Sequence, residues 1–225
     1  MLFFHKKKTY QSSGYFKGYT DYHCHILPGV DDGVKTMPQS LEILAEYEQI
    51  GVSDVWCTPH VMEDIPNTTA GLQQRFDELK TAYKGNIRLH LAAEYMMDGL
   101  FEERLEAGDL LTLGDEGDQI LVETSYFNKP IHMEQTLHDI MSKGLFPVLA
   151  HPERYIYIAD MKTYRELKQM GVRLQMNLGS IAEVYGKTAK RKALMLTKEK
   201  AYNYTGTDLH NIQLLHTILN TKIPN

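Results

Sequence analysis

The sequence contains no long apolar run and very few cysteines. No stretch of its 225 residues has the length and apolarity of a membrane-spanning helix, and its first residues place apolar side chains ahead of basic ones, the reverse of a signal peptide. Its two cysteines, Cys24 and Cys57, cannot build a disulfide framework, and each lies in a stretch that predicts a buried strand. We therefore expect a cytoplasmic protein with reduced thiols.

An excess of positive charge is missing as well. The 24 lysines and arginines are outnumbered by 29 aspartates and glutamates, which gives a net charge of -5. Because proteins that bind nucleic acid normally carry a basic excess or stripe, we expect no nucleic-acid partner. We interpret residues 1–17, with lysines at positions 6–8, as a flexible basic tail that could make weak contact with an anionic membrane surface.

Among the residues that are present, the stretch Asp21-Tyr22-His23-Cys24-His25 is the most informative. Residues i and i+2 of an extended segment face the same way, so His23 and His25 can present two imidazoles to one point. A carboxylate from Asp31 or Asp32 would add the oxygen ligand that hydrolytic metal sites usually include. The spacing indicates a metal site, although a His-x-His pair alone also occurs by accident.

The rest of the chain alternates between strand and helix patterns. Strand patterns cover residues 19–26, 52–58, 87–93, 119–122, 146–150, 172–176 and 201–205. Helix patterns cover residues 36–50, 72–83, 98–106, 131–142, 161–170 and 180–200, and a short helix closes the chain. The alternation predicts parallel strands joined by right-handed crossovers, hence a single α/β sheet or barrel domain over residues 18–225.

Histidines and carboxylates follow the carboxyl ends of nearly all these strands. In a parallel barrel those ends share one face, so side chains scattered through the sequence would converge there. A core would not use such groups repeatedly, because burying them is costly unless they are paired or bound to metal. We therefore predict a metal cluster built from His23, His25, Asp32, His60, Glu94, Glu123, His151, Asp208 and His210.

Five short motifs, in this order, resemble the PHP (polymerase and histidinol phosphatase) superfamily. They are Asp-x-His-x-His at 21–25, Thr-Pro-His at 58–60, Ala-Glu at 93–94, His-Pro-Glu-Arg at 151–154 and Thr-Asp-Leu-His at 207–210. Within it, the Asp-Asp-Gly step at 31–33 and the segment 151–155 most resemble the bacterial capsule-type, metal-dependent protein tyrosine phosphatases. The resemblance implies a distorted seven-stranded, TIM-like (β/α)7 barrel with three divalent metal ions, manganese foremost and iron or zinc as alternatives.

The resemblance also distributes the ligands over three metals. His23, His25, Glu94 and Asp208 would hold the first metal, Glu94, Glu123 and His151 the second, and Asp32, His60 and His210 the third. A water shared by two close metals becomes hydroxide near neutral pH and can attack phosphorus in line. Three dications would also make the site positive in an acidic protein, so that it attracts phosphate.

Arg154 is the predicted phosphate-binding residue, and with Glu94 and Asp208 it makes up the predicted catalytic set. A guanidinium can pair with two phosphate oxygens at once. The alternative is a surface arginine that pairs with Glu153 or Asp160.

The implied function is hydrolysis of phosphotyrosine on proteins, with the tyrosine kinase that controls capsular or exopolysaccharide export as the implied substrate. Cysteine-dependent chemistry is excluded, because an arginine would have to follow the cysteine by six residues and Val30 and Glu63 occupy those positions. Capsule-type enzymes also tend to carry a second arginine soon after the Asp-x-His step, whereas no cation lies between His210 and Lys222. Two alternatives stay open: a small-molecule phosphatase of the histidinol-phosphate type, and a non-catalytic PHP domain that serves as an interaction module.

Overall fold

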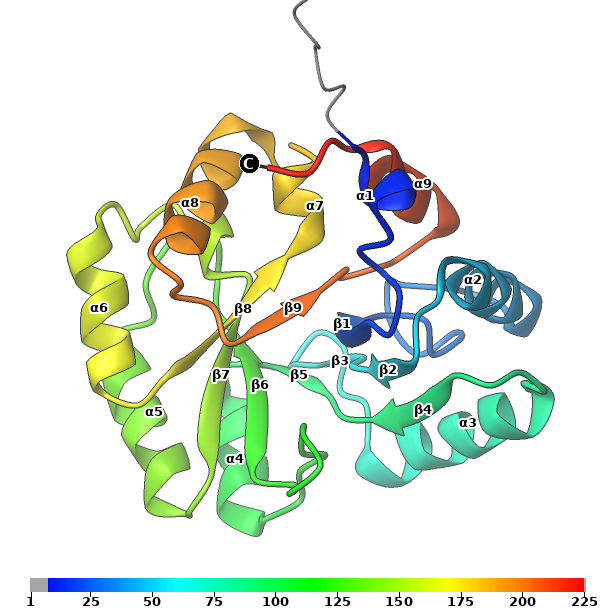
Figure 1. Cartoon of the computed structure of the whole chain (residues 1–225). Helices are drawn as coiled ribbons and strands as arrows, with labels where there is room; N and C mark the ends of the chain where they lie inside the picture. The colour runs from blue at the N-terminus through cyan, green and yellow to red at the C-terminus, as the bar shows by residue number, and fades with distance from the viewer. Residues whose placement is uncertain (1–7, 225) are drawn as a thin grey trace, which may run out of the picture.

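Parallel strands lie at the centre of the molecule and helices surround them (Figure 1). The structure is a computed structural model and describes residues 8–224. Its strands are β1 (Thr20–Cys24), β2 (Asp54–Cys57), β3 (His60–Val61), β4 (Arg88–Leu91), β5 (Glu94–Met96), β6 (Gln119–Glu123), β7 (Phe146–Ala150), β8 (Arg173–Asn177) and β9 (Tyr204–Gly206). Its helices are α1 (Tyr10–Ser13), α2 (Met37–Ile50), α3 (Thr69–Ala82), α4 (Gly99–Ala107), α5 (Met133–Ser142), the 3-10 turn η1 (Pro152–Arg154), α6 (Met161–Gln169), α7 (Leu178–Ile181), α8 (Gly186–Lys198) and α9 (Ile212–Asn220).

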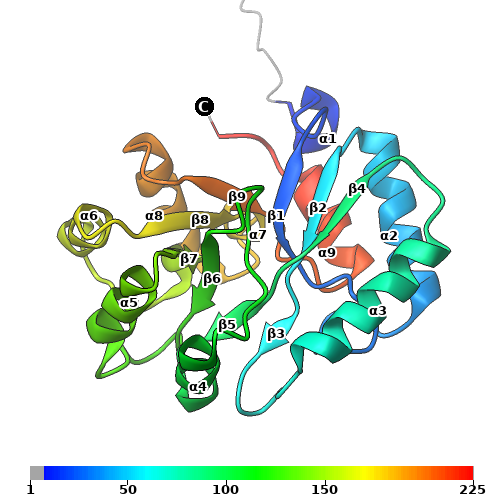
Figure 2. The same cartoon turned by 90° about the horizontal axis from the view of Figure 1, so that it is seen from below.

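The strands pair into two sheets, and every pair of neighbours is parallel. One sheet has the order β1-β2-β4 and the other the order β3-β5-β6-β7-β8-β9. In Figure 2, α2 and α3 lie beside the first sheet, while α5, α6 and α8 lie beside the second. Because the strands are parallel, the residues that follow their carboxyl ends gather on one side of the molecule.

Two of the expected strands are interrupted, so residues 8–224 contain nine strands where the sequence predicts seven. Residues 52–58 form β2, but Pro59 has no amide hydrogen with which to extend the ladder, and the chain resumes as β3 in the other sheet. Residues 87–93 form β4 only as far as Leu91, and β5 begins at Glu94. The Glu94 amide donates to the Pro59 carbonyl over 3.0 Å, so the two chain segments stay adjacent across the break.

The first strand also meets the segment that follows the last one. Cys24 and Leu209 form a parallel bridge between them. The amide of His25 donates to the Leu209 carbonyl over 2.9 Å, and the amide of Asp208 donates to the His23 carbonyl over 2.7 Å. Backbone pairing therefore places predicted ligands from opposite ends of the chain side by side.

The middle strands of the larger sheet, β6, β7 and β8, are buried on both faces over most of their length. Ile120 and Val122 of β6 belong to the main core, whereas Leu121 between them belongs to a second, smaller cluster. That cluster also contains Trp56, Ala92, Leu113, Val148 and Ala150. Burial on both faces is typical of parallel sheets and explains why the strands are near-continuous apolar runs in the sequence.

Sequence signals locate α2 correctly, but one other helix prediction is wrong. Thr36 precedes α2, proline lies in its first turn, and the helix ends at Gly51 in the left-handed conformation. The long helix predicted over residues 180–200 is instead two helices, α7 and α8. Glu183, between them, has a φ of 65°, a left-handed conformation that a continuous helix cannot contain.

The flexible tail predicted over residues 1–17 is too long. Residues 1–7, with their predicted membrane contact, lie outside the described residues. From Thr9 onward the chain is folded: Tyr10 and Phe16 are only 3% and 1% exposed, and the Tyr10 amide donates to the Thr221 carbonyl over 2.9 Å. Burial of these two rings outweighs the local polarity on which the prediction depended. Across residues 8–224, no helix has both the length and the apolarity to span a membrane.

Candidate metal centre

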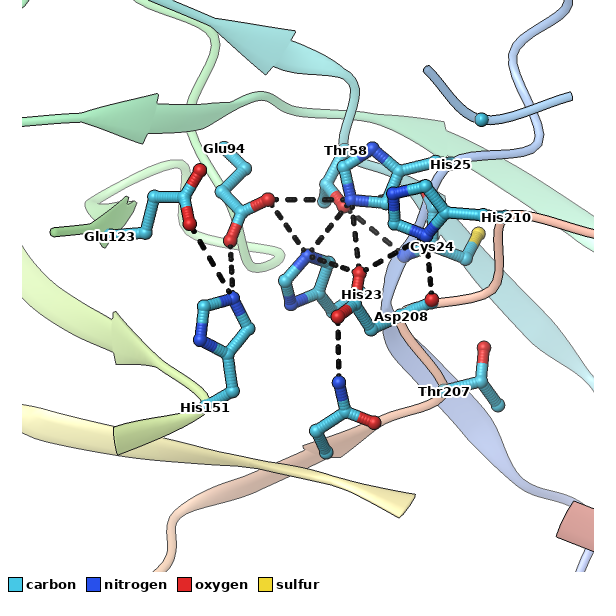
Figure 3. A network of polar contacts seen from close by, with 12 residues as sticks. His23, Cys24, His25, Thr58, Glu94, Glu123, His151, Thr207, Asp208 and His210 are labelled. Carbon is cyan, nitrogen blue, oxygen red and sulfur yellow. Dashed lines mark hydrogen bonds and ion pairs between the residues drawn. The ribbon is translucent and has the colours of Figure 1, made fainter. Parts of the chain in front are cut away.

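The structure brings all nine predicted ligands together at the carboxyl ends of β1, β2, β4, β6, β7 and β9; Figure 3 shows most of them. Their ligand atoms form four overlapping groups, and within each group all atoms lie within 4.8 Å of one another. The groups are His23, His25 and Glu94; His23, His151 and Asp208; His60, Glu94 and Glu123; and His25, Asp32, His60 and His210. The ligands belong to β1, β3, β5 and β6 or to the segments after β1, β7 and β9, and their convergence is what parallel topology predicts.

Four side chains form the centre of the cluster. The Nε2 atoms of His23 and His25 face each other at 3.1 Å. The Oε2 atom of Glu94 lies 3.1 Å from the first and 3.3 Å from the second. The Oδ1 atom of Asp208 lies 3.5 Å and 3.3 Å from the same two nitrogens. These four residues are the ones that the family resemblance assigns to the first metal.

On one side of this centre, carboxylates surround His151. Its Nε2 atom lies 2.9 Å from Glu94 Oε1 and 3.7 Å from Glu123 Oε2. Glu94 therefore faces His151 with one oxygen and His23 and His25 with the other, which is the arrangement expected of a bridging ligand.

On the other side, His60 lies between two groups. Its Nδ1 atom is 3.1 Å from Glu94 Oε2 and 3.2 Å from Glu123 Oε1, while its Nε2 atom is 3.5 Å from Asp32 Oδ1. His210 Nε2 approaches the same Asp32 oxygen at 3.3 Å. His60 is therefore more central than the sequence assignment, which places it only with Asp32 and His210.

Two residues beyond the nine fix the imidazole orientations. Asp31 Oδ2 lies 2.8 Å from His25 Nδ1, and Gln175 Oε1 lies 2.9 Å from His23 Nδ1. When each Nδ1 carries the proton and donates it to these oxygens, each Nε2 presents its lone pair to the cluster. Of the two carboxylates first considered beside the His-x-His pair, Asp32, the predicted ligand, lies in the cluster, and Asp31 orients a histidine. Gln175 was missed, and the available signal was a glutamine between Leu174 and Met176 in a largely buried strand.

The backbone around the cluster allows close approach. A Cβ atom at Gly206 would lie 2.5 Å from His23 Cβ, and one at Gly33 would lie 2.3 Å from the His25 carbonyl oxygen. Only glycine fits these two positions without displacing a ligand. His151 and Asp208 have φ values of 32° and 52°, conformations that are uncommon for residues other than glycine and are held by the surrounding contacts.

The electrostatics of the cluster favour a bound cation. Burial alone would lower the pKa of His23, but the carboxylates of Glu94 and Asp208 outweigh it and raise that pKa to about 9. Burial alone would raise the pKa of Glu94, but the imidazoles of His23 and His60 hold it well below its usual range. The fully buried carboxylates are thus stabilised as anions by whatever positive charge lies between them.

One buried carboxylate oxygen of the cluster is not satisfied by a hydrogen bond. Glu94 Oε2 is buried and makes no hydrogen bond within residues 8–224, although ring nitrogens of His23, His25 and His60 lie within 3.3 Å of it. An unsatisfied buried carboxylate oxygen is expensive. Imidazole nitrogens and carboxylate oxygens together suit manganese, iron, zinc or cobalt, so the residues fit divalent metal ions.

The cluster forms the floor of a cavity of about 540 Å³. Arg154 is the only lysine or arginine among the described residues that line it. Its Nη1 atom donates to Asp208 Oδ2 at 2.8 Å, and its Cζ atom lies 4.3 Å and 4.0 Å from the ring centroids of Tyr126 and Tyr185. The alternative of a surface pair with Glu153 or Asp160 is therefore wrong.

The position of the missing second arginine is occupied by neutral residues. Asn211 and Gln213 follow His210 and line the same cavity. Neither can pair with phosphate as a cation, so on the present geometry Arg154 would contact phosphate without a second arginine.

Comparison with known proteins identifies the family. The chain is 32% identical over 198 residues to the tyrosine-protein phosphatase YwqE of Bacillus subtilis, covering 86% of this chain and 78% of that protein. It is 27% identical over 215 residues to the tyrosine-protein phosphatase CpsB of Streptococcus agalactiae, covering 86% and 84%.

A solved structure agrees with these relatives. It belongs to a study of YwqE from Bacillus subtilis and CpsB from Streptococcus pneumoniae, described as unique metal-dependent tyrosine phosphatases. It superposes with a TM-score of 0.80 at 28% identity, over 89% of this chain and 85% of that one. The family model for capsular polysaccharide synthesis, CpsB/CapC, matches residues 19–217, and the chain therefore belongs to the CpsB/CapC family.

Proposed function

We propose that this protein is a metal-dependent protein tyrosine phosphatase that hydrolyses phosphotyrosine on a protein substrate. The observation that carries the proposal is the position of Arg154 beside Asp208, in a cavity that is also lined by the predicted ligands Asp32, His60, Glu94, His151 and His210. The names of the relatives support the substrate, and the donor set supports the dependence on metal.

The ligand groups suggest how metals would be held. We propose three divalent ions, manganese foremost: one at His23, His25, Glu94 and Asp208, one at Glu94, Glu123 and His151, and one at Asp32, His60 and His210, with His60 also facing Glu94 and Glu123. When bound, such ions supply positive charge to phosphoryl oxygens and lower the pKa of a bound water.

Arg154 would bind the phosphate. Burial would lower the pKa of its guanidinium, but the Asp208 carboxylate outweighs burial and raises it, so the group stays charged. Two tyrosine rings hold the guanidinium between them, which leaves its planar fork little freedom to lose when it pairs with phosphate oxygens. Asp208 thus contacts both the cluster and Arg154, and it fixes the phosphate site relative to the metals.

The shape of the cavity favours an aryl phosphate held on a chain. Tyr126, Tyr185 and Val184 line its wall, and Asp32, whose side chain is 65% exposed, lies at its mouth. A phenol also leaves readily, since its pKa is near 10, whereas an alcohol such as histidinol needs a proton. These points favour phosphotyrosine over histidinol phosphate.

The biological setting and finer fold are inferred as well. We infer that the substrate is the tyrosine kinase of a capsular or exopolysaccharide export system and that the protein acts in the cytoplasm; the family supports the first and the two buried free cysteines support the second. We also infer that the two sheets are parts of one distorted seven-stranded (β/α)7 barrel. The bridge between Cys24 and Leu209 supports this closure.

One experiment separates these functions. We expect kcat/KM for an aryl phosphate and a phosphotyrosine peptide to exceed that for histidinol phosphate and a phosphoserine peptide by far, all measured with one metal. Chelation should abolish turnover, and manganese should restore it. A tenfold preference for histidinol phosphate would overturn the tyrosine assignment, and absence of turnover with every substrate after metal loading would favour the interaction module.

A further inference from the structure

Helix α8 carries a concentration of positive charge in an acidic protein. It holds five of the chain's 24 lysines and arginines and no acidic residue, whereas the whole chain has a net charge of -5. In both Figure 1 and Figure 2 the helix lies at the outside of the molecule, beside the larger sheet. A charge of one sign gathered on one helix creates a local field opposite to that of the rest of the surface.

Most of these cations lie on the outer face. Lys187, Lys190, Arg191 and Lys198 recur at helical spacing and border a shallow groove of about 380 Å³. The fifth, Lys192, points inward and donates to the Tyr155 carbonyl at 2.6 Å. We call the four outer cations, together with Leu194 and Met195 between them, the α8 basic face.

The charges of this face are mostly unneutralised. Lys190 pairs with Glu183 at 3.1 Å. Within residues 8–224, Lys187, Arg191 and Lys198 make no ion pair, and all three are exposed. The exposed Met195 and half-buried Leu194 supply apolar surface between them.

The α8 basic face continues from the wall of the phosphate cavity. Val184 and Tyr185 line that cavity, and Tyr185 packs on Arg154 at 4.0 Å. Helix α8 begins at the next residue, so Lys187 lies two residues from the cavity wall. A peptide whose phosphotyrosine contacts Arg154 can therefore place its neighbouring residues on α8.

We propose that the α8 basic face binds acidic side chains on the same segment as the phosphotyrosine, so that the preferred substrate is a phosphotyrosine flanked by aspartate or glutamate. This inference rests on the proposed function and names its substrate class. Carboxylates complement Lys187 and Arg191, and the apolar surface between the cations accepts the aliphatic parts of the segment.

The test compares two phosphotyrosine peptides that differ only in flanking residues, acidic in one and neutral in the other. We expect the acidic peptide to have a kcat/KM about three- to tenfold higher at low salt, with the advantage falling as salt rises. The double variant Lys187→Glu, Arg191→Glu should remove or reverse this ratio. The matched control Lys80→Glu, Lys84→Glu changes two exposed lysines at α3, on the opposite side of the molecule in both cartoons, and should keep the ratio.

Binding without turnover keeps the test independent of the proposed function. The acidic peptide with plain tyrosine should bind, by fluorescence anisotropy, more weakly to the α8 double variant than to the α3 control. Equal binding and equal ratios in all proteins would overturn the inference. Loss of binding to anionic phospholipid vesicles in the α8 variant, with the peptide ratio unchanged, would also overturn it and assign the face to lipid. A protein that binds the acidic peptide but hydrolyses no aryl phosphate would instead overturn the proposed function.

Discussion

Glu94 and Glu153 are both completely buried glutamates, but their surroundings differ. Glu153 accepts hydrogen bonds from the Asn177 amide at 2.9 Å, the Ser180 hydroxyl at 2.8 Å and the Tyr202 hydroxyl at 2.9 Å. Glu94 has ring nitrogens around it and one oxygen without a hydrogen bond. Neutral donors satisfy the Glu153 carboxylate, whereas the Glu94 carboxylate needs a cation.

The pKa shifts of the two carboxyls follow this difference. Burial raises the pKa of Glu153, and its neutral donors only partly offset that rise. The imidazoles of His23 and His60 outweigh burial at Glu94 and lower its pKa. A buried carboxylate that holds structure together and one that holds a ligand can therefore be told apart by the charge and completeness of their partners.

The largest expected effect is on Glu94. Glu94→Gln keeps the shape and removes the charge, so we expect kcat/KM to fall by more than about a hundredfold because metal is lost or misplaced. Circular dichroism should show an unchanged fold, and metal analysis should show reduced metal content. Glu153→Gln is the matched control, and it should keep kcat/KM within about threefold per folded molecule. Equal losses of kcat/KM in the two variants would show that Glu94 and Glu153 do not differ in the way proposed.

Replacement of Glu153 should instead lower the stability of the fold. Glu153→Leu leaves three buried donors without an acceptor, so we expect a loss of about 3 kcal/mol in the free energy of unfolding, measured by urea denaturation. A loss below about 1 kcal/mol would show that these donors do not depend on Glu153.

Arg154 tests the link between the cluster and the substrate. Arg154→Lys keeps the charge but cannot make a two-pronged contact. We therefore expect kcat/KM to fall by an amount that corresponds to a loss of about 1.5 to 3 kcal/mol in transition-state stabilisation. Arg154→Ala should lose at least as much. Arg173, which lies over the Phe146 ring at the other end of the strands, offers the control Arg173→Lys, for which no loss of turnover is expected. Unchanged kcat/KM in both Arg154 variants would remove it from the phosphate site.

The smallest effect comes from a third kind of buried carboxylate, Asp54, which lies beside an arginine. Burial would raise its pKa, but bonds from Arg88 at 2.5 and 2.6 Å lower it from 3.8 to about 2. A lowered folded pKa gives stability that is present above about pH 4 and is lost as the pH falls towards 2. Because Arg88 is largely exposed, we expect only about 1 kcal/mol. At pH 7, Asp54→Asn should lower the free energy of unfolding by this amount, about 1 kcal/mol. Between pH 4 and 2, the free energy of unfolding should fall less in the variant than in the unmodified protein. Parallel falls in the two proteins would contradict the prediction.

Much of the site could be predicted from the sequence because parallel topology fixes where strand ends lie. His60, Glu123 and His151 each follow an apolar run, and that alone places them on one face. Alternation then places His23 and His25 together. The nine ligands needed no knowledge of side-chain packing.

What could not be predicted depends on contacts between segments far apart in the chain. Gln175 looks like one polar residue in a strand until His23, 152 positions away, lies against it. The rings of Tyr126 and Tyr185 hold Arg154 only because two loops meet. The folded start of the chain depends likewise on Tyr10 meeting Thr221.

The pairing of β1 with the segment after β9 has a consequence for synthesis of the protein. His23 and His25 leave the ribosome early, but Asp208 and His210 follow them only 185 residues later. Until then the early ligands lack these partners. A polypeptide released before residue 208 would therefore fold, at best, into a sheet with an unfinished centre, and metal capture depends on a segment made long after the first ligands.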